Sequence, residues 1–101
     1  MTRLFAVMNR RGPRWDPGKK MEEQPHWRAH ADFMNGLHAA GHVLLGGPLV
    51  DTPDVLLIMR AQSEAEVTAL LAPDIWVVTE LLQLGSVKPW ELRLGNLPPS
   101  K

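Results

Sequence analysis

The segment "WRAHADFMNGLHAAGHVLLGGPL", residues 27–49, contains the pattern that decides the fold. At 100° per residue its first part forms one apolar stripe of a helix, and polar residues occupy the opposite side. Pro25 is tolerated in a first helical turn, and Gly41 is typical of the position just after a helix. The sequence therefore predicts a helix from about Pro25 to residue 40. Its stripe consists of Trp27, His30, Met34, Leu37 and Gly41.

The next two apolar runs predict a β-hairpin. Residues 42–50, "HVLLGGPLV", are typical of a strand that is interrupted at residues 46–48. Proline cannot donate to a sheet ladder, so this point is an edge, a bulge or a bend. Residues 51–54, "DTPD", have turn chemistry, and residues 55–60, "VLLIMR", form a second apolar strand.

The outer parts of the chain predict two more strands and a second helix. Residues 3–9, "RLFAVMN", indicate a buried strand, and the alternation in residues 86–94, "SVKPWELRL", indicates a half-buried one. Residues 63–66, "SEAE", form a capping box for a helix that Pro73 ends, and Asp74 caps a further turn. The order of elements predicts an α+β, ferredoxin-like βαββαβ fold with a four-stranded antiparallel sheet.

Residues 10–24 are predicted to be a long loop without regular structure. Loops of this length usually have a function or are mobile. Trp15 within it is either an anchor or a lid side chain. Residues 1–95 are predicted to form one domain, and residues 96–101 a flexible tail. One sheet face is left uncovered by helices, so a second subunit is expected to pack against it.

Composition excludes several function classes. The 11 basic and 11 acidic residues cancel, which gives no electrostatic footprint for nucleic acid or an anionic membrane. The absence of cysteine excludes disulfides, thiolate nucleophiles and cysteine-based metal sites. No run approaches the ~20 apolar residues of a membrane span. A cytoplasmic protein is expected.

His30 is the first candidate for a functional residue, because it lies in the middle of the apolar stripe. Each unsatisfied buried polar group costs about 1–3 kcal/mol, so its ring nitrogens need partners. Two interpretations stay open at this point. His30 is either a core residue with both nitrogens bonded, or it faces a pocket.

Metal or nucleotide binding finds little support in the sequence. His26 and His30 are an i, i+4 pair, as are His38 and His42, but the His-Glu-x-x-His arrangement is absent. Gly41 ends the predicted helix before His42, and no Gly-x-Gly-x-x-Gly loop occurs. We expect no metal and no cofactor.

The chain resembles the YciI-like (YCII-related) family of dimeric α/β-barrel proteins. The resemblance rests on His30, on Gly41 eleven residues later and on the following Gly47-Pro48 pair, together with "PDIW" (73–76) and "SVKPW" (86–90). It implies a homodimer that pairs into a dimeric α/β barrel, and a site centred on a histidine and an aspartate. The sequence differs from the family pattern at two positions. It has Ile75 where the family usually has proline, and Trp27 where many members carry arginine.

The resemblance implies that His30 and Asp74 are a catalytic acid/base pair, with Asp74 orienting the imidazole. The expected function is a cofactor-independent lyase or isomerase that acts on a small organic, cyclic or phenolic substrate. Dehydrochlorination of a chlorinated hydroxyquinol is an activity associated with the family. The expected substrate-binding residues are Trp27, Met34, Gly47, Pro48, Asp51 and Trp76.

Several alternatives remain. Asp74 is also explained as a helix cap, Asp51 as a turn residue and Gly47-Pro48 as a bend. A homodimer that binds a small ligand without catalysis, or that supports a partner enzyme, would use the same pocket. A haem-binding or oxygen-using protein would use His30 or His38 as an axial ligand.

Overall fold

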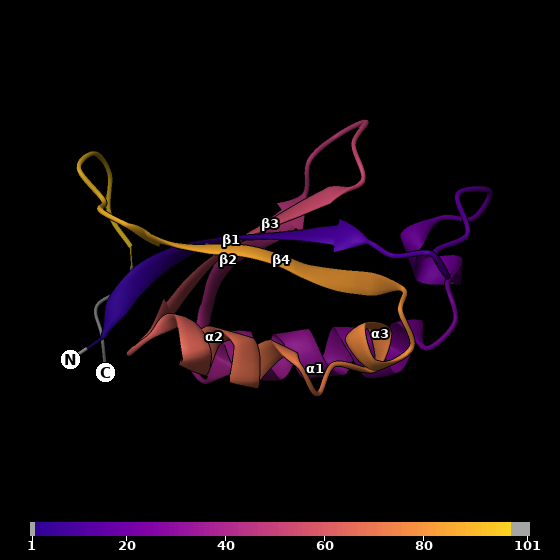
Figure 1. Cartoon of the computed structure of the whole chain (residues 1–101), viewed down its shortest axis with the longest axis horizontal. Coiled ribbons are helices and arrows are strands. Elements are labelled where there is room, and N and C mark those ends of the chain that lie inside the picture. The colour runs from indigo at the N-terminus through magenta and orange to yellow at the C-terminus, as the bar shows by residue number, and fades with distance from the viewer. Residues whose placement is uncertain (1, 98–101) are drawn as a thin grey trace.

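A computed structural model of the chain describes residues 2–97. A four-stranded antiparallel sheet forms one layer, and the helices lie together on one of its faces (Figure 1). The spatial order of the strands is β2-β3-β1-β4. This is the α+β, ferredoxin-like arrangement that the sequence predicted. The strands are β1 (Arg3–Arg11), β2 (Val43–Pro48), β3 (Asp54–Ala61) and β4 (Leu82–Trp90).

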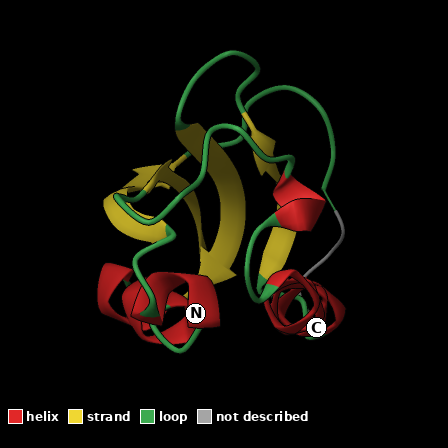
Figure 2. Ribbon diagram, turned by 90° about the vertical axis from the view of Figure 1, so that its right-hand side faces the viewer, coloured by secondary structure: helices red, strands yellow, loops and turns green. Residues whose placement is uncertain are grey.

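The helices connect the strands and cover a single face, as the end-on view in Figure 2 shows. The long helix α1 ends as predicted, because Gly41 adopts φ 87° just after it. The N–H groups of Gly41 and His42 donate to the carbonyls of His38 and Leu37, at 3.0 and 2.9 Å. The helices are α1 (Trp27–Ala39), α2 (Glu64–Leu71), the short α3 (Ile75–Val78) and the 3₁₀ turn η1 (Met21–Glu23).

Two hydrophobic clusters lie between the sheet and the helices. We call the first the central core. It is formed by Phe5, Val7, Val43, Leu57, Met59, Ala61, Val67 and Leu71. We call the second the tryptophan cluster. It is formed by the buried residues Trp76, Leu81 and Leu82, with Trp15 and Trp27 packed against them.

The other face of the sheet carries apolar side chains, and no helix of residues 2–97 covers it (Figure 2). Successive residues of a strand point to opposite faces, so Ala6 and Met8 point away from the helices. Ala6 lies opposite Ile58 and Met8 opposite Leu56 on β3. Leu45 on β2 and Trp90 on β4 flank this surface and are 57% and 40% exposed. We call this surface the open sheet face.

A β-bulge between β1 and β4 interrupts the regular pairing. Met8 pairs with Ser86 and Arg10 with Gln83, so two residues of β4 oppose Asn9 alone. A Cβ atom at Gly85 would lie 2.1 Å from the carbonyl oxygen of Met8, so only glycine allows this approach. The bulge brings the N–H of Gly85 to the carboxamide oxygen of Asn9, which accepts it at 3.3 Å.

Several predicted boundaries were wrong. Strand β1 continues to Arg11 rather than ending at residue 9, and β4 begins at Leu82 rather than at residue 86. The last strand ends at Trp90 rather than residue 94, because Trp90 already pairs with Leu4 near the start of β1. Helix α1 begins at Trp27 rather than Pro25, because His26 has the left-handed φ of 63°. The irregularity in β2 lies between Val43 and Leu45 rather than at residues 46–48, although β2 is an edge strand as expected.

The connection after β1 also differs from a simple loop. It contains η1, and the side chain of the buried Gln24 ties it together. The Gln24 amide donates to the carbonyls of Asp16 and Lys19, and its oxygen accepts from the N–H of Asp16. The half-buried Trp15 packs edge-on against Trp76, which is the anchoring role.

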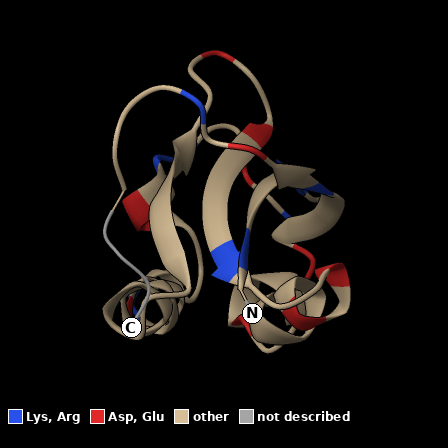
Figure 3. Ribbon diagram, turned by 90° about the vertical axis from the view of Figure 1, so that its left-hand side faces the viewer, with Lys and Arg blue, Asp and Glu red and all other residues tan. Residues whose placement is uncertain are grey.

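The remaining predictions concern the ends of the chain and its surface. Of the predicted tail, residues 98–101 lie outside the described residues, and residues 96 and 97 form no helix or strand. The positions of basic and acidic residues are spread along the ribbon in Figure 3, and the formal net charge is zero. Within residues 2–97, no helix is long and apolar enough to cross a membrane.

Candidate functional site

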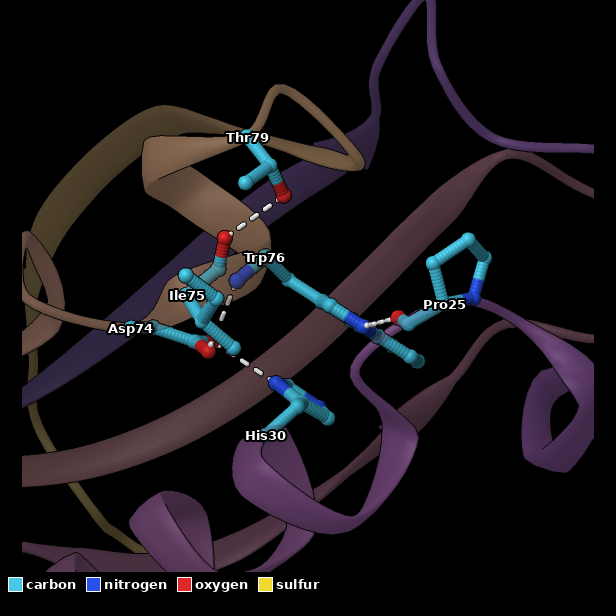
Figure 4. A network of polar contacts seen from close by, with 6 residues as sticks. All are labelled: Pro25, His30, Asp74, Ile75, Trp76 and Thr79. Atoms are coloured by element: carbon cyan, nitrogen blue, oxygen red, sulfur yellow. Dashed lines mark hydrogen bonds and ion pairs between the residues drawn. The ribbon is translucent and has the colours of Figure 1, made fainter.

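The structure brings His30 and Asp74 together, although 44 positions separate them in the sequence. The Nδ1–H of His30 donates to Oδ2 of Asp74 at 2.7 Å (Figure 4). Their side chains are 12% and 3% exposed, so little water competes for this contact. Helix α1 supplies the imidazole, and the start of α3 supplies the carboxylate.

Asp74 uses its two carboxylate oxygens for different purposes. Oδ1 accepts the backbone N–H of Trp76 at 3.1 Å and caps α3, while Oδ2 faces His30. The cap holds the carboxylate in place before any ligand binds. The helix-cap interpretation and the pairing with His30 are therefore compatible, because one side chain serves both.

Trp76 fixes the orientation of the imidazole ring. The indole lies parallel to the His30 ring, with centroids 3.8 Å apart and an interplanar angle of 7°. Its Nε1–H donates to the carbonyl of Pro25 at 2.7 Å, which ties α3 to the segment that precedes α1 (Figure 4). Trp15 and Trp27 then pack against Trp76, at centroid distances of 5.3 and 5.8 Å.

The second nitrogen of His30, Nε2, is not sealed in the protein interior. No hydrogen bond joins Nε2 to another group of residues 2–97, and no fully buried side-chain nitrogen or oxygen in that range lacks a partner. Nε2 is therefore not fully buried. The His30 side chain also lines a cavity of about 430 Å³ between α1 and the sheet.

The predicted substrate-binding residues divide into two groups. Met34, Gly47, Pro48 and Trp76 line the cavity with His30 and Asp74. A Cβ atom at Gly47 would meet nothing within 4 Å, so packing does not require glycine there.

The structure does not bring Trp27 or Asp51 to this cavity. Trp27 contacts the outer sides of His30 and Trp76. Asp51 is an exposed residue of the turn between β2 and β3, with φ 62°. It lines an adjoining hollow, which shares Arg11, Trp15, Met21 and Pro48 with the cavity. The turn therefore holds Asp51 away from the His30 ring.

Three polar cavity residues were missed: Asn9 and Arg11 from β1, and Asn35 from α1. His38 of α1, which the sequence suggested only as a haem ligand, also lines the cavity. A signal for the first two exists in the sequence, because Phe5, Val7, Asn9 and Arg11 are alternate residues of one strand and share a face. His38 directs its Nδ1–H to the carbonyl of Val43 at 2.7 Å.

The arrangement suits proton transfer more than metal binding. Within residues 2–97, no group of three or more His, Asp or Glu side chains is placed to hold a metal ion. A histidine that is oriented by a carboxylate and open on its other nitrogen is the geometry of a general acid/base. The cavity around it is lined mainly by apolar side chains, as is usual for small-molecule sites.

Comparisons with known proteins identify a similar fold. No protein-family model matches the chain, and no curated protein is similar to it. A solved structure is similar: 5-chloro-2-hydroxyhydroquinone dehydrochlorinase from Burkholderia phenoliruptrix AC1100, in complex with 2,5-dihydroxybenzoquinone. The TM-score is 0.59 and the identity 23%, over 91% of this chain and 95% of that chain. The two chains share one fold. A fold alone does not determine an activity.

Proposed function

We propose that this protein is a cofactor-independent lyase or isomerase of the YciI-like family that acts on a small cyclic or phenolic compound. The observation that carries the proposal is the 2.7 Å contact between Nδ1 of His30 and Asp74, in a histidine that lines a cavity of about 430 Å³. The fold shared with a dehydrochlorinase that acts on a hydroquinone adds support for the substrate class.

In this proposal His30 transfers the proton. Asp74 accepts the Nδ1–H, so the neutral ring presents the lone pair of Nε2 to the cavity. Nε2 removes a proton from a C–H or O–H group of the substrate. In an elimination, the electron pair of that bond forms a new double bond, and the leaving group departs with its own electron pair. In an isomerisation, the proton returns from Nε2 to another carbon.

Asp74 acts as a positioning residue. Its carboxylate stabilises the imidazolium that forms when Nε2 takes up a proton, and its fixed cap contact means that it does not have to reorganise. Trp76 restricts the ring to one plane by stacking against it. Both effects keep Nε2 directed into the cavity.

Turnover of 5-chloro-2-hydroxyhydroquinone, together with a panel of phenols and lactones, tests this function. We expect the H30N variant to lose about 10²- to 10⁴-fold in kcat, the usual contribution of a general acid/base. The matched control is H26N, because His26 is an exposed histidine that does not line the cavity. Unaltered turnover by H30N would overturn the catalytic role and leave a ligand-binding protein.

We also propose that the protein is a homodimer that pairs through the open sheet face. The half-buried apolar residues Ala6, Met8 and Leu56 lie side by side there without a covering helix within residues 2–97. Burial of such a surface is favourable by about 25 cal/mol per Å². The family resemblance supports a second copy of the chain as the partner.

The oligomeric state can be measured by light scattering coupled to gel filtration. We expect the wild-type chain to elute at twice the mass of one chain. M8K should give monomers, because it places a charge in the middle of the interface. A69K, on the exposed surface of α2, should remain dimeric. A monomeric wild-type protein would contradict the proposal.

A further inference from the structure

The cavity contains a cation that the proposed proton transfer does not use. Arg11 is the last residue of β1 and lines the cavity together with His30 and Asp74. Within residues 2–97, Arg10, Arg28 and Arg93 each pair with a carboxylate, and Arg11 takes part in none of these ion pairs. An unpaired, half-buried charge is costly unless a partner of opposite charge is available.

Comparison with the neighbouring Arg10 shows that the missing ion pair of Arg11 is explained by its position in the strand. Arg10 points to the opposite face of β1, is 63% exposed and pairs with Asp54 at 3.7 Å. The alternation that turns Arg10 outward turns Arg11 toward the cavity. Two adjacent residues of the same type therefore differ in burial and in pairing, and one is a natural control for the other.

The guanidinium of Arg11 is held in a defined place. Its central carbon lies 4.3 Å from the centroid of the Trp15 ring, a cation–π contact. The backbone around Trp15 is fixed in turn, since Gly12 donates to Leu81 and Arg14 to Glu80. A Cβ atom at Gly12 would lie 2.3 Å from the Glu80 carbonyl oxygen, so only glycine permits this approach.

A second, neutral donor lies beside Arg11 on the same face of β1. Asn9 is 3% exposed and lines the cavity. Its carboxamide oxygen already accepts the N–H of Gly85, which leaves its NH₂ group as the remaining donor. Arg11 and Asn9 together offer N–H donors and one positive charge, which is the combination that recognises an ionised oxygen.

Aromatic rings connect this end of the cavity to the proton-transfer end. Trp15 meets Trp76 edge-on at 5.3 Å, and Trp76 stacks on His30 at 3.8 Å. Trp15, Trp76, Arg11 and His30 all line the same cavity. A flat ring fits beside indole surfaces, with its charged substituent at one end and its reacting bond at the other.

We propose that Arg11 and Asn9 form a subsite for an ionised oxygen, so that the substrate is a planar ring compound carrying a phenolate or enolate oxygen. This inference rests on the proposed function, because it places the substrate between Arg11 and Nε2 of His30. The positive charge of Arg11 also stabilises the negative charge that develops on the ring when Nε2 removes a proton.

Calorimetric titration with two related probes tests the subsite. One probe is 2,5-dihydroxybenzoquinone, whose hydroxyl groups ionise, and the other is its dimethyl ether, which cannot ionise. We expect the wild-type protein to prefer the ionised probe. R11Q should weaken binding of that probe about 10- to 100-fold, the range for a hydrogen bond to a charged group. Binding of the dimethyl ether should change less than about threefold.

Two further variants separate charge from structure. R11K keeps the charge and should retain part of the preference, and R10Q should bind both probes as the wild type does. If R11Q lost the same affinity for both probes, or lost affinity for neither, the proposed subsite would be overturned. Failure of the wild-type chain to bind the ionised probe would overturn the proposed ring class. Normal turnover by H30N would instead overturn the proposed function alone.

Discussion

The central core and the tryptophan cluster lie on the same face of one sheet but differ in what they contain. The central core holds only apolar side chains, with Phe5, Met59 and Val67 at 0% exposure. The tryptophan cluster packs around the polar His30–Asp74 pair and borders the cavity. Stability is therefore expected to depend mainly on the first, and ligand binding on the second.

Truncation in the central core is expected to have the largest effect on stability. F5A should lower the free energy of unfolding by about 3–5 kcal/mol, because it leaves a cavity in a fully buried position. Urea unfolding followed by circular dichroism measures this loss. V78A, at an exposed residue of α3, should change stability by less than about 0.5 kcal/mol. Similar losses for both variants would remove the contrast between core and surface.

Removal of the Asp74 carboxylate should be the next largest effect. D74A removes the α3 cap, which contributes ~1 kcal/mol. It also leaves the ring Nδ1–H of His30 without its acceptor, which costs about 1–3 kcal/mol. We expect a total of about 2–4 kcal/mol by urea unfolding. D74N keeps an acceptor and should lose less. If D74A were as stable as the wild-type protein, the two contacts would contribute little.

A single helix cap away from both clusters should have the smallest effect. The Ser63 hydroxyl accepts the N–H of Glu66 at 3.1 Å at the start of α2. S63A should lower the free energy of unfolding by ~1 kcal/mol. T68A, at an exposed position within α2, is the control, since alanine favours helix and should not destabilise it. A larger loss in T68A than in S63A would contradict the capping assignment.

Local patterns in the sequence were enough to predict the order of the elements. Apolar periodicity predicted the strands and helices, and Gly41 and Ser63 predicted where two helices end and begin. These features depend on neighbours within a few residues. The sequence also placed His30 in the apolar stripe, and the resemblance paired it with Asp74.

Features that depend on distant parts of the chain were missed. The length of β1 determines where β4 ends, and the bulge that contains Gly85 determines the place of Asn9. Gln24 ties down the connection after β1 through hydrogen bonds to Asp16 and Lys19, which no local pattern indicates. One local feature was also misplaced, because the Glu66 side chain accepts the N–H of Gln62 rather than that of the cap residue Ser63.

The central claim is that His30 and Asp74 act as one proton-transfer unit, and a double-mutant cycle in kcat tests it most directly. H30N, D74N and the double variant would be compared on the best substrate of the panel. If the pair acts as a unit, the double variant should be about as slow as H30N, because residues of one catalytic unit are not additive. Losses that multiply, or normal turnover by H30N, would contradict the account.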